Sequence, residues 1–245
     1  MVAYVAYKEL MMVKSEENSI EEHKEEIERE LEFGAGYRWQ HWTRAISIVV
    51  LVATGFYIAV PFISPVQTAQ PDNFLYALFR SWHIIFGFIL TYVIFYKSFM
   101  FLYGRKHQME RDAIKDIFNI KIWQKQIGYY LLVSKHPKLS GVYNPIQFMA
   151  YVGFYVMMFL LILTGFILYV HVYHDGLGGL LYSPMRYFEV AFGGLAMVRE
   201  IHHIAMWGVI LFIVGHIYMA IYNAVFGKEG AMDAIFSGMK WHKKH

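Results

Sequence analysis

Five of the twelve histidines in this chain lie within or at the ends of strongly apolar segments. They are His41, His83, His202, His203 and His216. An ionisable side chain is costly inside a bilayer, so it marks a functional site by default and takes a partner within the protein. A single such histidine is as readily explained by helix packing and a hydrogen bond to a neighbour. Several of them in related positions indicate a shared role, and imidazole is a common metal ligand.

The spacing of the last three histidines separates one of them from the other two. His202 and His216 are 14 residues apart, which on a helix leaves them only about 40° apart in direction and roughly 21 Å apart along the axis. They therefore share one helix face at two depths. His203 is 13 residues from His216 and points away from that face, which makes it a candidate for a supporting or docking role.

The elements that carry these histidines are membrane-length apolar runs. The chain has 245 residues, of which 57% are hydrophobic and 17% charged. A run of about 20 apolar residues crosses a bilayer as a helix. Four such runs occur, at 39–62, 74–103, 145–170 and 198–226. The sequence therefore predicts an all-α integral membrane protein built as a four-transmembrane-helix bundle.

Lysine and arginine are distributed unevenly between the two sides of this bundle. The 63–73 loop has none and the 171–197 loop has only Arg186, whereas five fall in 1–38 and eight in 104–144. Positive charge accumulates on the cytoplasmic side, so both termini and the 104–144 loop are predicted to be cytoplasmic. Three regions follow: an acidic arm at 1–33, the bundle at 34–226 and a basic tail at 227–245. The acidic run within the arm, 16–33, favours a solvated helix or a mobile arm.

This topology pairs the histidines by depth. The second and fourth spans start outside, so His83 and His202 lie near the outer surface, while His41 and His216 lie toward the cytoplasm. The chain has no cysteine, which excludes iron–sulfur clusters, thiolate metal sites and covalent c-type haem. Two facing imidazole pairs without a carboxylate nearby suit two bis-histidine b-type haems better than zinc or copper sites, which usually need further ligands.

Three other residues are candidates for contact with these haems. Gly55 follows His41 by 14 residues, which places a position without a side chain at the outer level, where a flat macrocycle needs close backbone approach. Lys97 follows His83 by 14 residues and could meet a haem propionate, or it could snorkel toward the cytoplasmic surface. Arg38, beside His41, is another propionate candidate, although the positive-inside pattern alone would explain its charge.

Three strings in the sequence resemble a known family. They are RWQHWTRAISIVVLVATGFYI (38–58), RSWHIIFG (80–87) and REIHHIAMWGVILFIVGHIYM (199–219). Together they are similar to the b-type cytochrome subunit of membrane-bound respiratory [NiFe] hydrogenases, over roughly residues 34–226. Thr43 replaces the aliphatic residue expected after His-Trp, and the N-terminal arm is extra. Neither departure touches a proposed ligand.

The resemblance implies a four-helix diheme subunit that anchors the hydrogenase small and large subunits to the outer face of the bacterial cytoplasmic (inner) membrane. Electrons would pass from hydrogen oxidation to a quinone, menaquinone or ubiquinone. The ligand positions of the family match His41, His83, His202 and His216, and the 171–198 loop would be the docking surface. Since it lacks cysteine, this subunit would not hold the nickel–iron centre itself, and no feature points to nucleic acid.

The related cytochrome subunit of formate dehydrogenase has a quinone site in a Gly-x-Tyr-Asn string. The string GVYNP (141–145) is similar, so Tyr143 and Asn144 are quinone candidates, with an N-cap before Pro145 the alternative for Asn144. Three other functions remain open at this point: a cytochrome subunit of a formate dehydrogenase-like oxidoreductase, a histidine-using transporter, and a passive anchor whose histidines only pack.

Overall fold

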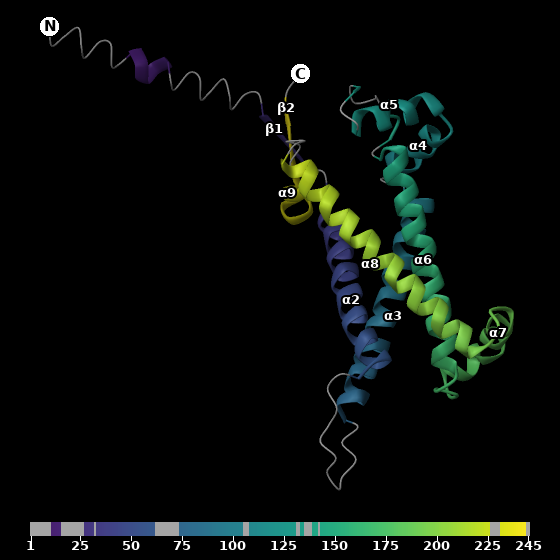
Figure 1. Ribbon diagram of the computed structural model, residues 1–245. Helices are drawn as coiled ribbons and strands as arrows, with labels where there is room; N and C mark the ends of the chain where they lie inside the picture. Colours follow the sequence, from purple (N-terminus) through teal and green to yellow (C-terminus); the bar gives the residue numbers. More distant parts are fainter. Residues whose placement is uncertain are drawn as a thin grey trace. The chain divides into compact units, whose positions relative to one another are not determined.

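Four long helices dominate the structure (Figure 1). The computed structural model describes residues 11–15, 27–31, 33–61, 74–104, 108–130, 133–134, 139–141, 143–225 and 231–243. Its long helices are α2 (Ala35–Ala59), α3 (Phe74–Tyr103), α6 (Pro145–Val170) and α8 (Leu195–Val225). Among the described residues, these are the four helices long and apolar enough to cross a membrane.

The predicted spans agree closely with these helices. The runs at 74–103 and 145–170 coincide with α3 and α6 at both ends, whereas α2 begins four residues earlier than the run at 39–62 and α8 three residues earlier than the run at 198–226. The prediction of an all-α, four-transmembrane-helix bundle is confirmed. The sidedness of the termini remains a prediction from charge.

The chain packs as two units. One comprises Gln40–Gly215, and the other combines the two ends, Met1–Trp39 and His216–His245. The first unit holds most of the four spans, together with α4 (Gln108–Ile117), α5 (Ile120–Tyr130) and α7 (Leu177–Ala191). The second holds α9 (Ala231–Ser237) and the strands β1 (Ile27–Leu31) and β2 (Met239–Lys243).

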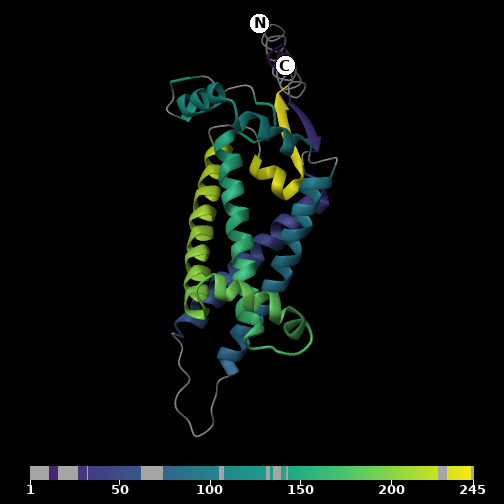
Figure 2. The same cartoon turned by 90° about the vertical axis from the view of Figure 1, so that its right-hand side faces the viewer.

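The core of the first unit draws on all four spans. Its buried apolar residues are Ile48, Leu90, Ile94, Phe154, Met158 and Val209. Figure 2 shows α6 beside α8, where the rings of Phe154 and Phe212 stack with their centroids 4.4 Å apart. Between 17 and 22% of each span's most apolar window is buried within the chain. The remaining apolar surface of the spans therefore suits a lipid environment.

Short helices close the bundle at the end where α3 finishes and α6 begins. Arg111 of α4 donates from Nη1 to the carbonyls of Phe101 and Gly104, at 2.7 and 2.9 Å, and so caps the C-terminus of α3. The buried carboxylate of Asp116 accepts from the backbone N–H of Ser140 at 2.7 Å. The first contact ties the 104–144 connection to α3, and the second joins two parts of the connection itself.

At the other end of the unit, α7 packs against the end of α6 (Figure 1). Glu189 of α7 is buried, and its Oε2 accepts from His171 and, at 2.6 Å, from Arg186. Burial alone would raise the pKa of this carboxyl, but the two hydrogen bonds outweigh it and hold the pKa of Glu189 below its usual value. A buried ionic contact therefore holds α7 against the residue that follows α6.

This contact predicts a loss of stability in acid. Because the folded-state pKa of Glu189 lies below its ordinary value of 4.5, its contribution is present above the unfolded pKa and is lost as pH falls through the folded pKa. Thermal unfolding of the detergent-solubilised chain should therefore be less pH-sensitive below pH 4.5 in Glu189→Gln than in the wild type. Glu200→Gln, at an exposed position of α8, is the matched control. Equal pH dependence in wild type and Glu189→Gln would contradict the prediction.

The second unit corrects one prediction. Residues 27–31 of the acidic run form a β-strand, whereas the sequence favoured a solvated helix or mobile arm for 16–33. Strand β1 pairs antiparallel with β2, with Ile27 opposite Lys243 and Leu31 opposite Met239. The reason is long-range: the ladder satisfies backbone groups with a partner at the opposite end of the chain, which local propensity does not reveal. Residues 16–26 lie outside the described residues.

Candidate functional site

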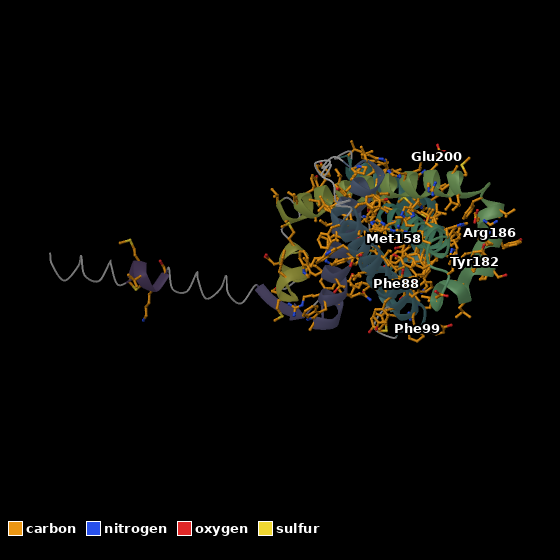
Figure 3. All side chains as sticks on the ribbon, turned by 90° about the horizontal axis from the view of Figure 1, so that it is seen from below. Phe88, Phe99, Met158, Tyr182, Arg186 and Glu200 are labelled. Atoms are coloured by element: carbon orange, nitrogen blue, oxygen red, sulfur yellow. The ribbon has the colours of Figure 1, made fainter. Side chains whose placement is uncertain are left out.

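A cavity of about 660 Å³ lies within the first unit, lined by all four spans. Its volume falls within the range typical of cofactor and ligand sites. Apolar side chains make up most of the wall, including Phe88 and Met158. Figure 3 shows these two residues among the bundle helices, whereas Tyr182 and Arg186 lie on α7 at the side.

Two histidines face one another across this cavity. His83 of α3 and His202 of α8 both line it, and their ring centroids are 6.4 Å apart with the ring planes at 57°. This is the outer pair that the depth argument predicted. His203, by contrast, is exposed and borders the cavity, while His202 supplies the ring that faces His83.

Each of the two rings is held by a threonine on a further helix. The Thr54 hydroxyl of α2 is 2.9 Å from Nδ1 of His83, and the Thr164 hydroxyl of α6 is 2.8 Å from Nδ1 of His202. Both hydroxyls also lie 2.7 Å from the carbonyl four residues earlier in their own helix, that of Val50 or of Leu160. All four spans thus contribute to the position of the histidine pair.

A glycine follows each threonine and lies against the same imidazole. A Cβ at Gly55 would be 3.3 Å from Cε1 of His83, and one at Gly165 would be 3.7 Å from Cε1 of His202. At Gly55 a side chain would therefore press on the ring. The absence of a side chain allows both helices to approach the histidines closely.

Two arginines and a histidine gather at one end of the cavity. Arg80 near the start of α3, Arg199 near the start of α8 and His171 at the end of α6 all line it. The guanidinium carbon of Arg80 is 5.8 Å from the ring centroid of Tyr173. The cavity thus has an apolar body and a basic rim, an arrangement that suits a flat apolar ligand with acidic groups at one edge.

The residues of the cavity fit a bis-histidine haem. Imidazole nitrogens bind metals at ~2.0 Å, so two axial imidazoles on one metal place their ring centres ~6.2 Å apart. The 6.4 Å separation of His83 and His202 is close to this value. Among the described residues, no three His, Asp or Glu side chains gather to hold a metal ion by themselves. A macrocycle such as haem supplies the further nitrogen ligands that two imidazoles leave open.

The inner pair divides between the two packing units. His41 belongs to Gln40–Gly215 and His216 to the unit formed by the chain ends, so their pairing remains a prediction. The sequence argument required His202 and His216 to lie on one helix, and α8 carries both. Lys97 of α3 is only 7% exposed, which is not the exposure of a lysine that snorkels to the surface.

The remaining predicted site residues take structural positions. Arg38 donates from Nη1 to the Phe236 carbonyl at 2.5 Å, next to α9. Asn144 caps α6: its Oδ1 accepts from the Gln147 N–H at 2.9 Å, and Oε1 of Gln147 accepts from the backbone N–H of Asn144. The ring of Tyr143 lies 4.9 Å from that of Tyr151. The cap that the sequence offered as an alternative for Asn144 is present.

The sequence interpretation missed Thr54, Thr164 and Gly165. A signal was available, because the string Thr-Gly-Phe occurs both at 54–56 and at 164–166, once in the first predicted span and once in the third. It also missed the basic rim formed by Arg80, Arg199 and His171. These residues lie near the ends of spans, where charged residues are common, so their charge alone does not indicate a site.

Comparison with known proteins places the chain in a family. The model of the family described as prokaryotic cytochrome b561 matches residues 32–238. The chain is 27% identical to a protein of Escherichia coli K12 named "Probable Ni/Fe-hydrogenase 1 B-type cytochrome subunit", with 86% of this chain and 90% of that protein covered.

Two further relatives have the name "Probable Ni/Fe-hydrogenase B-type cytochrome subunit". The one from Rhodobacter capsulatus is 26% identical, over 86% of this chain and 81% of its own length. The one from Azotobacter vinelandii is 28% identical, over 86% and 88%. The family match covers the four spans and the cavity that they enclose, and the chain belongs to the prokaryotic cytochrome b561 family.

Proposed function

We propose that the chain is the membrane-anchoring cytochrome b subunit of a Ni/Fe hydrogenase, and that it transfers electrons from hydrogen oxidation to the membrane quinone pool. The observation that carries this proposal is the pair of His83 and His202, which face one another across an apolar cavity at a spacing that suits one haem iron. The names of the relatives point to the hydrogenase partner.

Two b-type haems would occupy the chain, one between His83 and His202 and the other between His41 and His216. Haem supplies one-electron redox chemistry at each position. The protein residues would hold and orient it: the imidazoles would bind the iron, the glycines would permit close approach, and the apolar walls would exclude water. Arg80, Arg199 and His171 on the rim would bind the propionates of the outer haem.

The two ends of the bundle would have different partners. With the topology predicted from charge, the rim and α7 face outward, where the small and large hydrogenase subunits would dock on 171–198. The cytoplasmic end would serve the quinone, with Tyr143 and Asn144 near it and the cap geometry of Asn144 fixing the local backbone. Charge would then move inward across the bacterial cytoplasmic membrane, with proton uptake from the cytoplasm, which makes the reaction electrogenic.

Purification of the native complex from membranes tests the proposal. A tagged chain should retain the Ni/Fe subunits, and hydrogen should reduce the b-type absorption bands and then a quinone. On the docking side, Leu180→Glu in α7 should weaken this association, because Leu180 is an exposed apolar side chain on the proposed surface. Phe118→Glu, at an exposed apolar position between α4 and α5, is the matched control.

Two outcomes would contradict the proposal. Retention of formate-oxidising subunits, with bands reduced by formate and not by hydrogen, would favour the formate dehydrogenase-like alternative. A chain without a b-type band would instead favour the transporter or the passive anchor. If Leu180→Glu retains the Ni/Fe subunits as well as the wild type does, the proposed docking surface is wrong, but the proposed function is not affected.

A further inference from the structure

The two halves of the outer site are built alike. Thr54 and Gly55 of α2 contact the ring of His83 on α3, and Thr164 and Gly165 of α6 contact the ring of His202 on α8. In both halves the threonine reaches Nδ1 and the glycine lies near Cε1. The repeated Thr-Gly-Phe string therefore makes the same contact twice, on opposite sides of the cavity.

The proton of each threonine hydroxyl is already committed. A hydroxyl has one proton to donate and two lone pairs to accept with. Val50 and Leu160 present backbone carbonyls 2.7 Å from the Thr54 and Thr164 oxygens, and a carbonyl can only accept. Each hydroxyl therefore donates to its own helix, a common contact for threonine in apolar helices. In its contact with the histidine, the threonine oxygen can therefore only accept a hydrogen bond.

An acceptor at Nδ1 determines which ring nitrogen carries the proton. In a neutral imidazole one nitrogen donates and the other accepts, so Nδ1 must carry the hydrogen that the threonine oxygen receives. The lone pair is then on Nε2, the nitrogen left for a metal. Partners of this kind fix the tautomer and orientation of metal-binding histidines, and a hydroxyl does so without a buried charge.

We propose that Thr54 and Thr164 are positioning residues that hold His83 and His202 as Nδ1-protonated imidazoles, with Nε2 available as the axial ligand of the outer haem. The proposal rests on the proposed function. A hydrogen bond from Nδ1–H to an acceptor raises the basicity of the ligand. A more basic ligand favours the oxidised iron, so the two threonines lower the midpoint potential of the outer haem relative to rings without this bond.

The variants Thr54→Val and Thr164→Val test the proposal, because valine keeps the shape of threonine and removes the hydroxyl. Thr54→Ser and Thr164→Ser keep the hydroxyl. Ser47→Ala is the matched control: the buried hydroxyl of Ser47 in α2 also donates to the carbonyl four residues earlier, that of Thr43 at 2.7 Å, but Ser47 is not among the residues that line the cavity. Loss of such a supporting bond typically weakens metal-site affinity by roughly 10–100-fold.

The expected result has two parts. In the full-length holoprotein, the Thr54→Val and Thr164→Val variants bind outer haem roughly 10–100-fold more weakly, and the outer haem that stays bound has a raised midpoint potential. The serine variants and Ser47→Ala match the wild type. In the haem-free chain, ¹⁵N spectra of labelled histidine show Nδ1-protonated rings at His83 and His202. The valine variants shift those signals toward a mixture of tautomers.

Three results would overturn the proposal. One is a set of valine variants with wild-type affinity, potential and ¹⁵N signals. Another is failure of serine to restore the wild-type values, which would assign the effect to the threonine methyl group. The third is an Nε2-protonated ring in the wild type. A wild-type chain that binds no haem would instead contradict the proposed function, while the ¹⁵N measurement would still decide the tautomer.

Discussion

Replacement of His202 by alanine is expected to remove the outer haem and to leave the inner one in place. The haem content of the purified chain should fall from about two to about one per chain, because a bis-histidine site that loses one axial ligand no longer holds its iron from both sides. His83→Ala should give the same result, since the two rings face one another at 6.4 Å. Quantification of haem and of protein in the same sample measures the number of haems per chain.

The neighbouring histidine supplies a close control for this experiment. His203 is adjacent in sequence, exposed, and also borders the cavity, yet His202 has the ring that faces His83. His203→Ala should therefore keep both haems, with an unchanged reduced-minus-oxidised spectrum. If His203→Ala loses the outer haem and His202→Ala keeps it, the assignment of the outer ligand on α8 is wrong.

His41→Ala and His216→Ala are expected to remove the inner haem and to abolish quinone reduction. Each should retain about one haem per chain, held by the intact outer site. In the complex, hydrogen should still reduce that haem, because the docking side and the outer pair are unchanged. Electron delivery to quinone should fall to background, since the route across the membrane is interrupted.

This second prediction separates a break in the electron route from general misfolding. Lys115→Ala is the control, at an exposed position of α4, and it should keep both haems and full quinone reduction. Hydrogen-driven reduction of the remaining haem in His41→Ala and His216→Ala shows that the outer half is folded. Normal quinone reduction in either variant would contradict the role of the inner pair.

The sequence was sufficient for the spans and for the outer pair. The spans follow from a physical requirement, because a bilayer admits only long apolar helices. The outer pair follows from the same requirement, since the depth of a histidine in one span selects its partner in another. Spacing within α8 separated His202 from His203, and in the structure the ring of His202 faces that of His83. The role of the two rings as haem ligands stays a prediction.

The parts that the sequence did not reveal depend on contacts between distant segments. Thr54 contacts His83 across 29 residues, and Thr164 contacts His202 across 38, and threonine is ordinary in membrane helices. Strand β1 forms only because β2 lies beside it. Likewise, Glu189 fixes α7 through His171, a residue on another element. The pattern within one segment does not identify its partner, and only the recurrence of Thr-Gly-Phe in two spans pointed to the threonines.

We propose that four histidines of this chain bind two b-type haems, and haem quantification together with a reduced-minus-oxidised spectrum of the purified full-length chain is the direct test. The wild-type chain should show b-type bands and about two haems per chain. The His83→Ala/His216→Ala double variant should hold none, since it breaks both bis-histidine sites. A wild-type chain without a b-type band, or a double variant with undiminished haem, would contradict it.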